Sequence, residues 1–314
     1  MTRVSVAQLF EANRDRLRLE WIAGRDGGAK HIDGVNLKES HEGLIGHLNF
    51  IHPNWIQVIS RAEINYLDTL DPIMRQQMLD KLLASGFICM IVTGGHRVPE
   101  HLRKLADRVH APLLSSPLDS MDLMGMLRSY LVRALADSTT MHGVFLDVLG
   151  LGVMLTGDSG VGKSELALEL ISRGSGLIAD DIIEFYRVAP ETLEGRCPVL
   201  LRDFLEVRGL GVLNIRSIFG EAALRPRKNL KLIVHLEKPA TPEVHYVERL
   251  PLKPGVQEIM GISVSEVTIP VAAGRNLAVL TEAAVRNYVL QLRGIDSTRD
   301  FIERQARHMK EGGK

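Results

Sequence analysis

The stretch GVMLTGDSGVGKSELALEL at residues 152–170 decides the fold of this protein. It begins with a strand-like apolar run, continues through a glycine-rich loop, and ends with apolar residues at helical spacing. Gly157 to Ser164 match the pattern G-x-x-x-x-G-K-[ST], which cradles a polyphosphate between a strand and a helix. The sequence therefore predicts a nucleotide-binding loop, or P-loop, in an α/β fold.

Each part of this loop has an expected role. Glycines allow successive backbone N–H groups to turn toward the phosphates, and the helix N-terminus adds partial positive charge. Lys163 is expected to reach the β- and γ-phosphates of ATP, and Ser164 to supply a hydroxyl ligand for Mg²⁺. The expected phosphate-binding residues are Gly157, Asp158, Ser159, Gly160, Val161, Gly162, Lys163 and Ser164. A glycine-rich turn without a ligand is the alternative.

Two adjacent acids, Asp180 and Asp181, end a short apolar strand that begins at Leu177. In a parallel sheet this strand end would face the same crevice as the glycine loop. One carboxylate could then help to hold Mg²⁺, and the other could accept a proton from an attacking hydroxyl group. A solvated acidic turn would look the same in the sequence.

The segment LEVRGLGVLN at residues 205–214 sets charged residues between apolar ones, beside close glycines. This pattern fits a loop shaped for a ligand, and it fits a glycine-rich hairpin equally well.

Composition limits the class of protein. The 314 residues exceed the usual size of one core, which favours two domains. Lys plus Arg and Asp plus Glu each number 38, so no net charge attracts nucleic acid or an anionic membrane, and we expect neither partner. Cys89 and Cys197 lack the spacing of a zinc site or disulfide framework. With no signal-like N-terminus and no apolar run of membrane-spanning length, a cytoplasmic location is expected.

Alternating strand and helix patterns over residues 1–135 predict a small parallel α/β domain. The small polar segment that starts at Ala136 then separates it from a second domain, residues 136–314, which contains the glycine loop. Strands are predicted at residues 55–59, 87–93, 112–115, 144–148, 152–156, 177–179, 230–236 and 267–271. Helices are predicted at residues 6–17, 64–67, 72–85, 99–109, 122–135, 165–172, 278–292 and 300–309.

The glycine loop, the paired acids and the segment at residues 205–214, in this order, resemble the HPr kinase/phosphorylase family. These are bacterial enzymes that act on a serine of the phosphocarrier protein HPr. The resemblance covers the whole predicted second domain. It rests on residues 142–144, 157–170, 177–181, 205–220 and 274–278.

This resemblance implies roles for particular residues. Asp181 would be the general base that takes the serine proton and returns it in the reverse reaction, with Asp180 as its neighbour. Glu206 would be a second Mg²⁺ ligand, and His142 an active-site histidine near the phosphates or the catalytic acid. Arg249 would stabilise charge on the phosphoryl group.

The resemblance also implies a fold and an assembly. The fold would be a small N-terminal α/β domain for regulation or assembly, followed by a C-terminal P-loop kinase domain. The chains would form a homohexamer that phosphorylates HPr with ATP, or with pyrophosphate as an alternative donor, and removes the phosphate by phosphorolysis. Where the family usually has a basic residue and proline before Gly-Arg-Asn, this chain has Ala272-Ala273, which puts the phosphorylase activity in question more than the kinase.

Two other functions fit the same motifs. One is a P-loop kinase of a different acceptor, and the other is a regulatory switch gated by a bound nucleotide. The paired acids and the segment at residues 205–214 favour an enzyme, because a pure switch needs no base poised for an acceptor hydroxyl.

Overall fold

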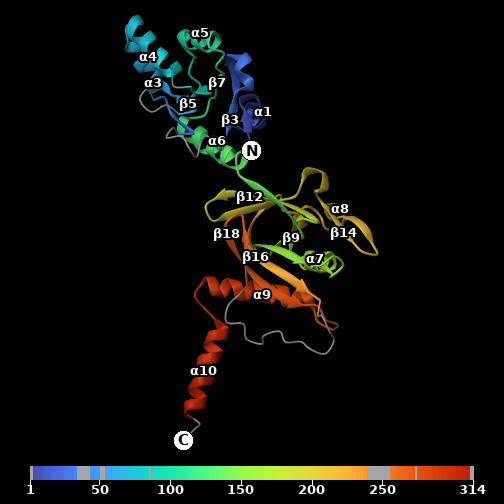
Figure 1. The fold of residues 1–314 in the computed structure, drawn as a ribbon. Coiled ribbons are helices and arrows are strands. Elements are labelled where there is room, and N and C mark those ends of the chain that lie inside the picture. The colour runs from blue at the N-terminus through green and yellow to red at the C-terminus, as the bar shows by residue number, and fades with distance from the viewer. Residues whose placement is uncertain are drawn as a thin grey trace. The chain divides into compact units, whose positions relative to one another are not determined.

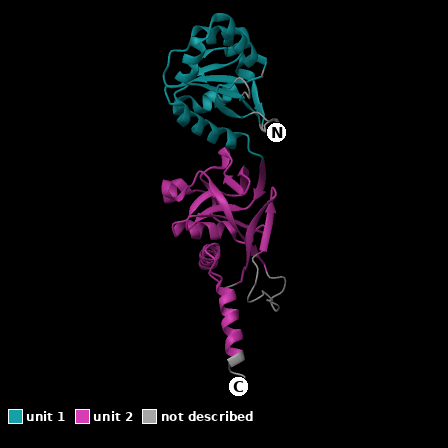
Figure 2. Ribbon diagram, turned by 90° about the vertical axis from the view of Figure 1, so that its left-hand side faces the viewer, with its two compact units in different colours: residues 1–137 teal, residues 138–314 magenta. Residues whose placement is uncertain are grey.

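The computed structural model describes residues 3–33, 43–49, 54–84, 86–238, 255–272 and 274–311 (Figure 1). Contacts divide the chain into two compact units, Met1–Asp137 and Ser138–Lys314 (Figure 2). This division lies two residues after the expected boundary between residues 135 and 136.

The first unit is built on a five-stranded sheet in the order β2-β7-β6-β5-β4. Strands β4, β5, β6 and β7 are parallel to one another, and β2 pairs antiparallel with β7 at one edge of the sheet. The strands are β1 (Arg3–Ser5), β2 (Glu20–Ala23), β3 (His31–Asp33), β4 (Ile45–His47), β5 (Ile56–Ile59), β6 (Cys89–Val92) and β7 (Leu113–Ser115). The helices are α1 (Val6–Leu17), the 3-10 helix η1 (Arg25–Ala29), α3 (Arg61–Thr69), α4 (Pro72–Ala84), α5 (Glu100–Arg108) and α6 (Ser120–Ala134).

Helices cover both faces of this sheet, which explains why its central strands are apolar throughout. Along β6, Cys89 and Ile91 pack with α1 and α6, whereas Met90 and Val92 pack with α3, α4 and α5. A capping box begins α3, since the Ser60 and Glu63 side chains each accept a hydrogen bond from the other residue's backbone N–H.

The second unit contains a nine-stranded sheet in the order β11-β9-β10-β16-β13-β12-β8, with β18 also pairing with β16 and β17 with β18. The strands are β8 (Ser138–His142), β9 (Val144–Val148), β10 (Leu151–Gly157), β11 (Gly176–Ala179), β12 (Ile182–Ala189), β13 (Thr192–Arg196), β16 (Lys228–Glu237), β17 (Gly255–Ile259) and β18 (Ile262–Pro270), with β14 (Phe204–Val207) and β15 (Gly211–Asn214) forming a separate hairpin. The helices are α7 (Lys163–Ser172), η2 (Val199–Leu201), α8 (Ile215–Phe219), η3 (Glu221–Ala223), α9 (Leu277–Leu292) and α10 (Ser297–Glu311).

The core of the second unit lies on both sides of β9 and β10. Val144, Leu146 and Val148 face α7, α9 and the β14–β15 hairpin. On the other face, Phe145 packs edge-on against Phe185 of β12, with 5.4 Å between the ring centroids. The apolar run before the glycine loop is thus a largely buried strand, β10, that leads directly into the loop and fixes its first residue.

Two sequence expectations for this unit were incomplete. The sheet near the glycine loop is mixed, because β9 lies between β10 and β11 and is antiparallel to both. Because β10 and β11 are both antiparallel to β9, they run in the same direction as each other and end at the same edge of the sheet. Within the polar segment expected to separate the domains, Ser138, Thr139 and Thr140 belong to β8, a strand of the second unit that pairs with β12. Helices within the described residues include none with the length and apolar character to cross a membrane.

Candidate active site

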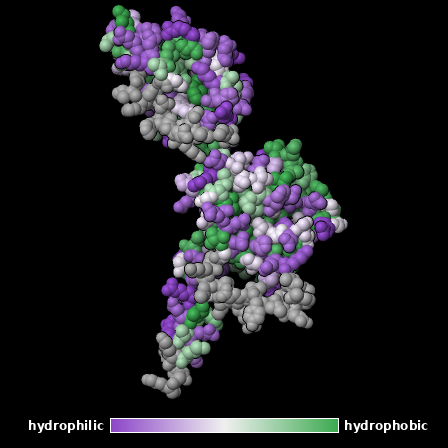
Figure 3. All heavy atoms as spheres, viewed as in Figure 1, coloured by the Kyte–Doolittle hydropathy of each residue, from purple (hydrophilic) through white to green (hydrophobic). Residues whose placement is uncertain are grey.

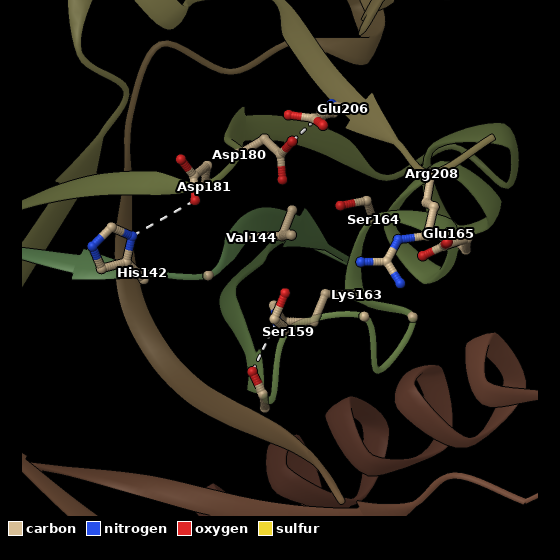
Figure 4. Close-up of a pocket in the computed structure, with 14 residues that line it drawn as sticks. His142, Val144, Ser159, Lys163, Ser164, Glu165, Asp180, Asp181, Glu206 and Arg208 are labelled. Carbon is tan, nitrogen blue, oxygen red and sulfur yellow. Dashed lines mark hydrogen bonds and ion pairs between the residues drawn. The ribbon is translucent and has the colours of Figure 1, made fainter. Parts of the chain in front are cut away.

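One cavity of about 370 Å³ brings together the glycine loop, the paired acids and the β14–β15 hairpin (Figure 4). Its lining consists of His142, Gly143, Val144, Gly157, Ser159, Gly160, Gly162, Lys163, Ser164, Glu165, Asp180, Asp181, Glu206 and Arg208. These residues come from segments up to 66 positions apart in the sequence, counted from His142 to Arg208. The shared strand direction of β10 and β11 is what places the acids beside the loop.

The glycine loop turns where only glycine fits. Gly157 has φ of 133°, and a Cβ added there would lie 2.3 Å from the carbonyl oxygen of Leu236 on the neighbouring strand β16. Inside the loop, the Lys163 ammonium donates to the carbonyl oxygens of Gly157 and Asp158 at 2.8 and 2.9 Å. Lys163, the first residue of α7, is therefore hydrogen-bonded to the beginning of the loop.

Asp158 and Val161 differ from the other expected phosphate-binding residues, because neither lines the cavity. The Val161 side chain is buried in the core, and its N–H donates to the Asp158 carbonyl at 3.2 Å. These two residues stabilise the shape of the loop, whereas Ser159, Gly160 and Gly162 line the cavity.

The two adjacent acids have different environments. Asp181 has φ of 63°, a left-handed conformation that Asp tolerates better than most residues. This turn leaves the Asp181 side chain 75% exposed, whereas Asp180 is only 9% exposed. Ile182 pairs with His142 across β12 and β8, and the His142 Nδ1 lies 3.6 Å from the Asp181 Oδ1. Backbone pairing thus brings the expected base and the expected histidine together.

Asp180 connects the acids to the hairpin. Its Oδ2 accepts a hydrogen bond from the Glu206 N–H at 2.8 Å. Burial raises the pKa of Asp180 above its ordinary value, and the charges of Asp181 and Glu206 act in the same direction, opposed by hydrogen bonds from the Glu206 and Asp181 backbones. Three carboxylates therefore meet at one end of the cavity, where a cation would relieve their repulsion.

The segment at residues 205–214 forms a hairpin and also lines the cavity, so both interpretations of its pattern hold. Leu205 and Val207 are buried in the core, and Glu206 alternates with them to face the cavity. Arg208 continues this alternation into the turn, and its guanidinium approaches Gly160 of the glycine loop. Arg208 is a site residue that no sequence motif predicted, although its spacing of two from Glu206, the period of one strand face, is a signal that could have identified it.

The residues present fit a Mg²⁺ ion. Ser164, Glu206 and Asp180 offer oxygen atoms, the ligands that Mg²⁺ prefers, around the same cavity. Mg²⁺ usually takes only one or two protein ligands and completes its shell with phosphates and water. The described residues contain no group of three or more His, Cys, Asp or Glu able to hold a metal by themselves. Arg249 lies outside the described residues.

Comparisons with known proteins cover both units. The family model described as "HPr Serine kinase N terminus" matches residues 4–131, and "HPr Serine kinase C-terminal domain" matches residues 133–305. The chain is 54% identical to the HPr kinase/phosphorylase of Nitrosomonas europaea over 309 residues, 98% of this chain and 96% of the relative.

It is also 53% identical to the HPr kinase/phosphorylase of Chromobacterium violaceum over 311 residues, 99% of this chain and 98% of the relative. A solved structure, the Hpr(Ser) kinase/phosphatase from Coxiella burnetii, shares 35% identity over 52% of this chain and 98% of that chain, with a TM-score of 0.45. On the full-length identities and the two family models, this chain belongs to the HPr kinase/phosphorylase family.

Proposed function

We propose that this chain transfers the γ-phosphoryl group of ATP to a serine of HPr and also removes it, by phosphorolysis, to give HPr and pyrophosphate. One observation carries the proposal. In a chain more than half identical to HPr kinase/phosphorylases along its whole length, the glycine loop, the His142–Asp181 pair and Glu206 line one cavity.

In the kinase direction, Asp181 accepts the proton of the serine hydroxyl group as the serine oxygen attacks the γ-phosphorus. The bond from that phosphorus to the β–γ bridging oxygen breaks, and ADP leaves. Exposure of the Asp181 side chain is required for this role, because the acceptor is part of another protein and must reach the base from outside. His142, 3.6 Å away, is placed to steady the charge on the Asp181 carboxylate.

The glycine loop and its lysine hold the donor. Backbone N–H groups at the N-terminus of α7 and the Lys163 ammonium would bind the phosphates, and this positioning would supply most of the catalysis expected for phosphoryl transfer. Ser164 and Glu206 would hold Mg²⁺, which would neutralise charge on the transferred group and orient it. Arg249 is proposed to stabilise the negative charge that develops on the phosphoryl group during transfer.

In the phosphorylase direction, an oxygen of inorganic phosphate attacks the phosphorus of phosphoserine. The bond from phosphorus to the serine oxygen breaks, a P–O–P bond forms, and Asp181 returns a proton to the serine oxygen. By the same chemistry in reverse, pyrophosphate is an alternative donor.

A positive charge remains near the loop that has lost the family's basic residue. Arg275 lines a hollow of about 400 Å³ together with Gly162 and Glu165, two residues that also line the main cavity. We propose that Arg275 compensates for Ala272-Ala273 in phosphorolysis.

The surface beside the cavity suits a protein acceptor. Hydrophobic side chains gather over α8 and the β14–β15 hairpin (Figure 3), where Leu210 and Val212 are 64% and 66% exposed. An apolar patch next to a catalytic site is typical of a docking surface for a protein. The same hairpin carries Glu206 and Arg208, so a docked protein would lie directly over the reacting groups.

A homohexamer and a cytoplasmic location remain part of the proposal. In the hexamer, HPr bound at one subunit would lie near the C-terminal helix of a neighbour. Size-exclusion chromatography with light scattering should give the mass of six chains, and the mass of a single chain at micromolar concentration would contradict the hexamer.

The proposed activity is tested by mass spectrometry of HPr. One sample contains HPr, the protein, ATP and Mg²⁺, and a second contains phosphoserine-HPr, the protein and inorganic phosphate. A serine phosphate in the first sample is expected, as is its loss with release of pyrophosphate in the second. Unmodified HPr in the first sample, with ATP still bound, would refute HPr as acceptor and favour a kinase of another substrate or a nucleotide-gated switch.

A further inference from the structure

The first unit, which carries none of the proposed catalytic residues, contains a second concentration of positive charge. A cavity of about 330 Å³ is lined by residues of α4 and α5, and we call it the basic cavity. Arg75 lines it from α4, and His101, Lys104 and Arg108 line it from α5. No carboxylate is among the described residues that line it.

Helical spacing explains how these side chains come to face one another. The lining positions are 72, 75, 76 and 79 on α4, and 101, 104, 105 and 108 on α5, so each set forms one face of its helix. Neighbouring helices usually meet through apolar side chains at such positions. Here the two faces bring like charges together, an arrangement that costs free energy unless an anion lies between them.

Arg75 is held in place by the preceding helix. Its guanidinium donates to the carbonyl oxygens of Leu67 and Leu70 at 2.8 and 2.9 Å, and to that of Asp68 at 3.4 Å. These bonds satisfy carbonyls at the C-terminal end of α3 without neutralising the positive charge. The cation therefore stays fixed at the edge of the cavity.

The two cations on α5 are weakly compensated. Arg108 lies 3.6 Å from Asp80, and both side chains are more than half exposed, so this ion pair stabilises little. Asp80 also accepts a hydrogen bond from Gln76 at 2.7 Å. Lys104 has no ion-pair partner among the residues that the structure describes.

His101 also lines the basic cavity and can report on what binds there. Its Nε2 is buried and has no hydrogen-bond partner among the described residues. Burial lowers the pKa of His101, the positive charge of Arg75 lowers it further, and Asp68 opposes both. Because His101 lines the cavity, an anion bound there would lie close to its ring and would favour the charged form of the imidazole.

We propose that the basic cavity binds a small molecule that carries a phosphate group. Lys104 and the Arg108 guanidinium can contact the phosphate from α5, and Arg75 adds its positive charge from α4. The volume of about 330 Å³ leaves room for more than the phosphate itself.

The test follows the His101 ring directly, because the catalytic cavity is also expected to bind phosphate. Full-length protein with ¹³C-labelled histidine is titrated by NMR between pH 5 and 9, with and without inorganic phosphate or glycerol 3-phosphate at constant ionic strength. Loss of one signal in His101→Gln identifies the ring. Either phosphate compound should raise the pKa of His101 by about half a unit or more, because the anion favours the charged ring, whereas glycerol should leave it unchanged.

Two variants of α5 provide a matched comparison. Lys104→Gln removes a lining charge, and Arg103→Gln removes an exposed charge from the adjacent position outside the cavity. The phosphate concentration that half-saturates the His101 shift should rise about tenfold in Lys104→Gln and change less than about twofold in Arg103→Gln. A His101 pKa that ignores both phosphate compounds, or equal effects of the two variants, would overturn the proposal.

Discussion

Asp181 combines an exposed carboxylate with a left-handed backbone, and this combination makes a clean test of its role possible. Asn also tolerates left-handed φ, so Asp181→Asn should preserve the turn while removing the proton acceptor. We expect kcat for HPr phosphorylation to fall about 10²- to 10⁴-fold, with nucleotide affinity unchanged. Steady-state kinetics and nucleotide titration measure the two quantities, and full activity would rule out Asp181 as the base.

Asp180 should influence stability more than its neighbour does. Its pKa is raised in the folded state, chiefly by burial, so the fold disfavours its ionised form. The native state then binds more protons than the unfolded state as pH rises through the window between the unfolded and folded pKa values. The unfolding free energy must therefore fall across that window.

Asp180→Asn cannot ionise, and its amide oxygen can still accept the Glu206 N–H bond. This variant should be more stable than the wild type at pH 7.5, with a difference that shrinks below the ordinary Asp pKa. Urea unfolding at several pH values, with EDTA present and nucleotide absent, checks this. Equal stability at pH 7.5 would mean that burial of the charge is compensated in the folded state.

At the scale of elements, the junction from β10 through the glycine loop to α7 depends on where each glycine lies. Gly157 and Gly162 both have positive φ, so alanine at either position costs about 1–3 kcal/mol in backbone strain. Only at Gly157 would a Cβ meet backbone, the Leu236 carbonyl oxygen at 2.3 Å, and at Gly162 nothing lies within 4 Å.

We therefore expect Gly157→Ala to destabilise the second unit clearly more than Gly162→Ala, because β16 must shift to admit the methyl group. Denaturant unfolding of the two variants, compared with wild type, measures the difference. Equal losses of unfolding free energy in the two variants would show that β16 shifts at no energetic cost and that backbone strain alone sets the destabilisation.

At the scale of the whole molecule, the two units have separate hydrophobic cores. Leu127 of α6 and Leu170 of α7 are both fully buried, each in the core of its own unit. Replacing either by Ala should cost about 2–5 kcal/mol through lost burial and the cavity left behind. We expect Leu127→Ala to lower the unfolding midpoint of the first unit, and Leu170→Ala that of the second.

Scanning calorimetry with and without Mg-nucleotide assigns the transitions, because a ligand raises only the midpoint of the unit that binds it. A single transition that both substitutions shift equally would show that the two units unfold as one.

The sequence by itself determined the local features of this protein. Apolar runs and the glycines around Lys163 located most of the α-helices and fewer than half of the strands that the described residues form, because periodicity and turn chemistry act between residues close in the chain. Likewise, the order of the motifs indicated the family, which the comparisons confirmed.

Only the tertiary structure decided which motifs meet and in what environment. The insertion of β9 between β10 and β11, the pairing of β8 with β12, and the approach of Arg208 to the glycine loop depend on hydrogen bonds and packing between distant segments. Asp180 and Asp181 look alike in the sequence, yet one is buried and the other exposed. Burial and electrostatics depend on everything that surrounds a side chain in space, and neighbours along the chain supply only part of that surrounding.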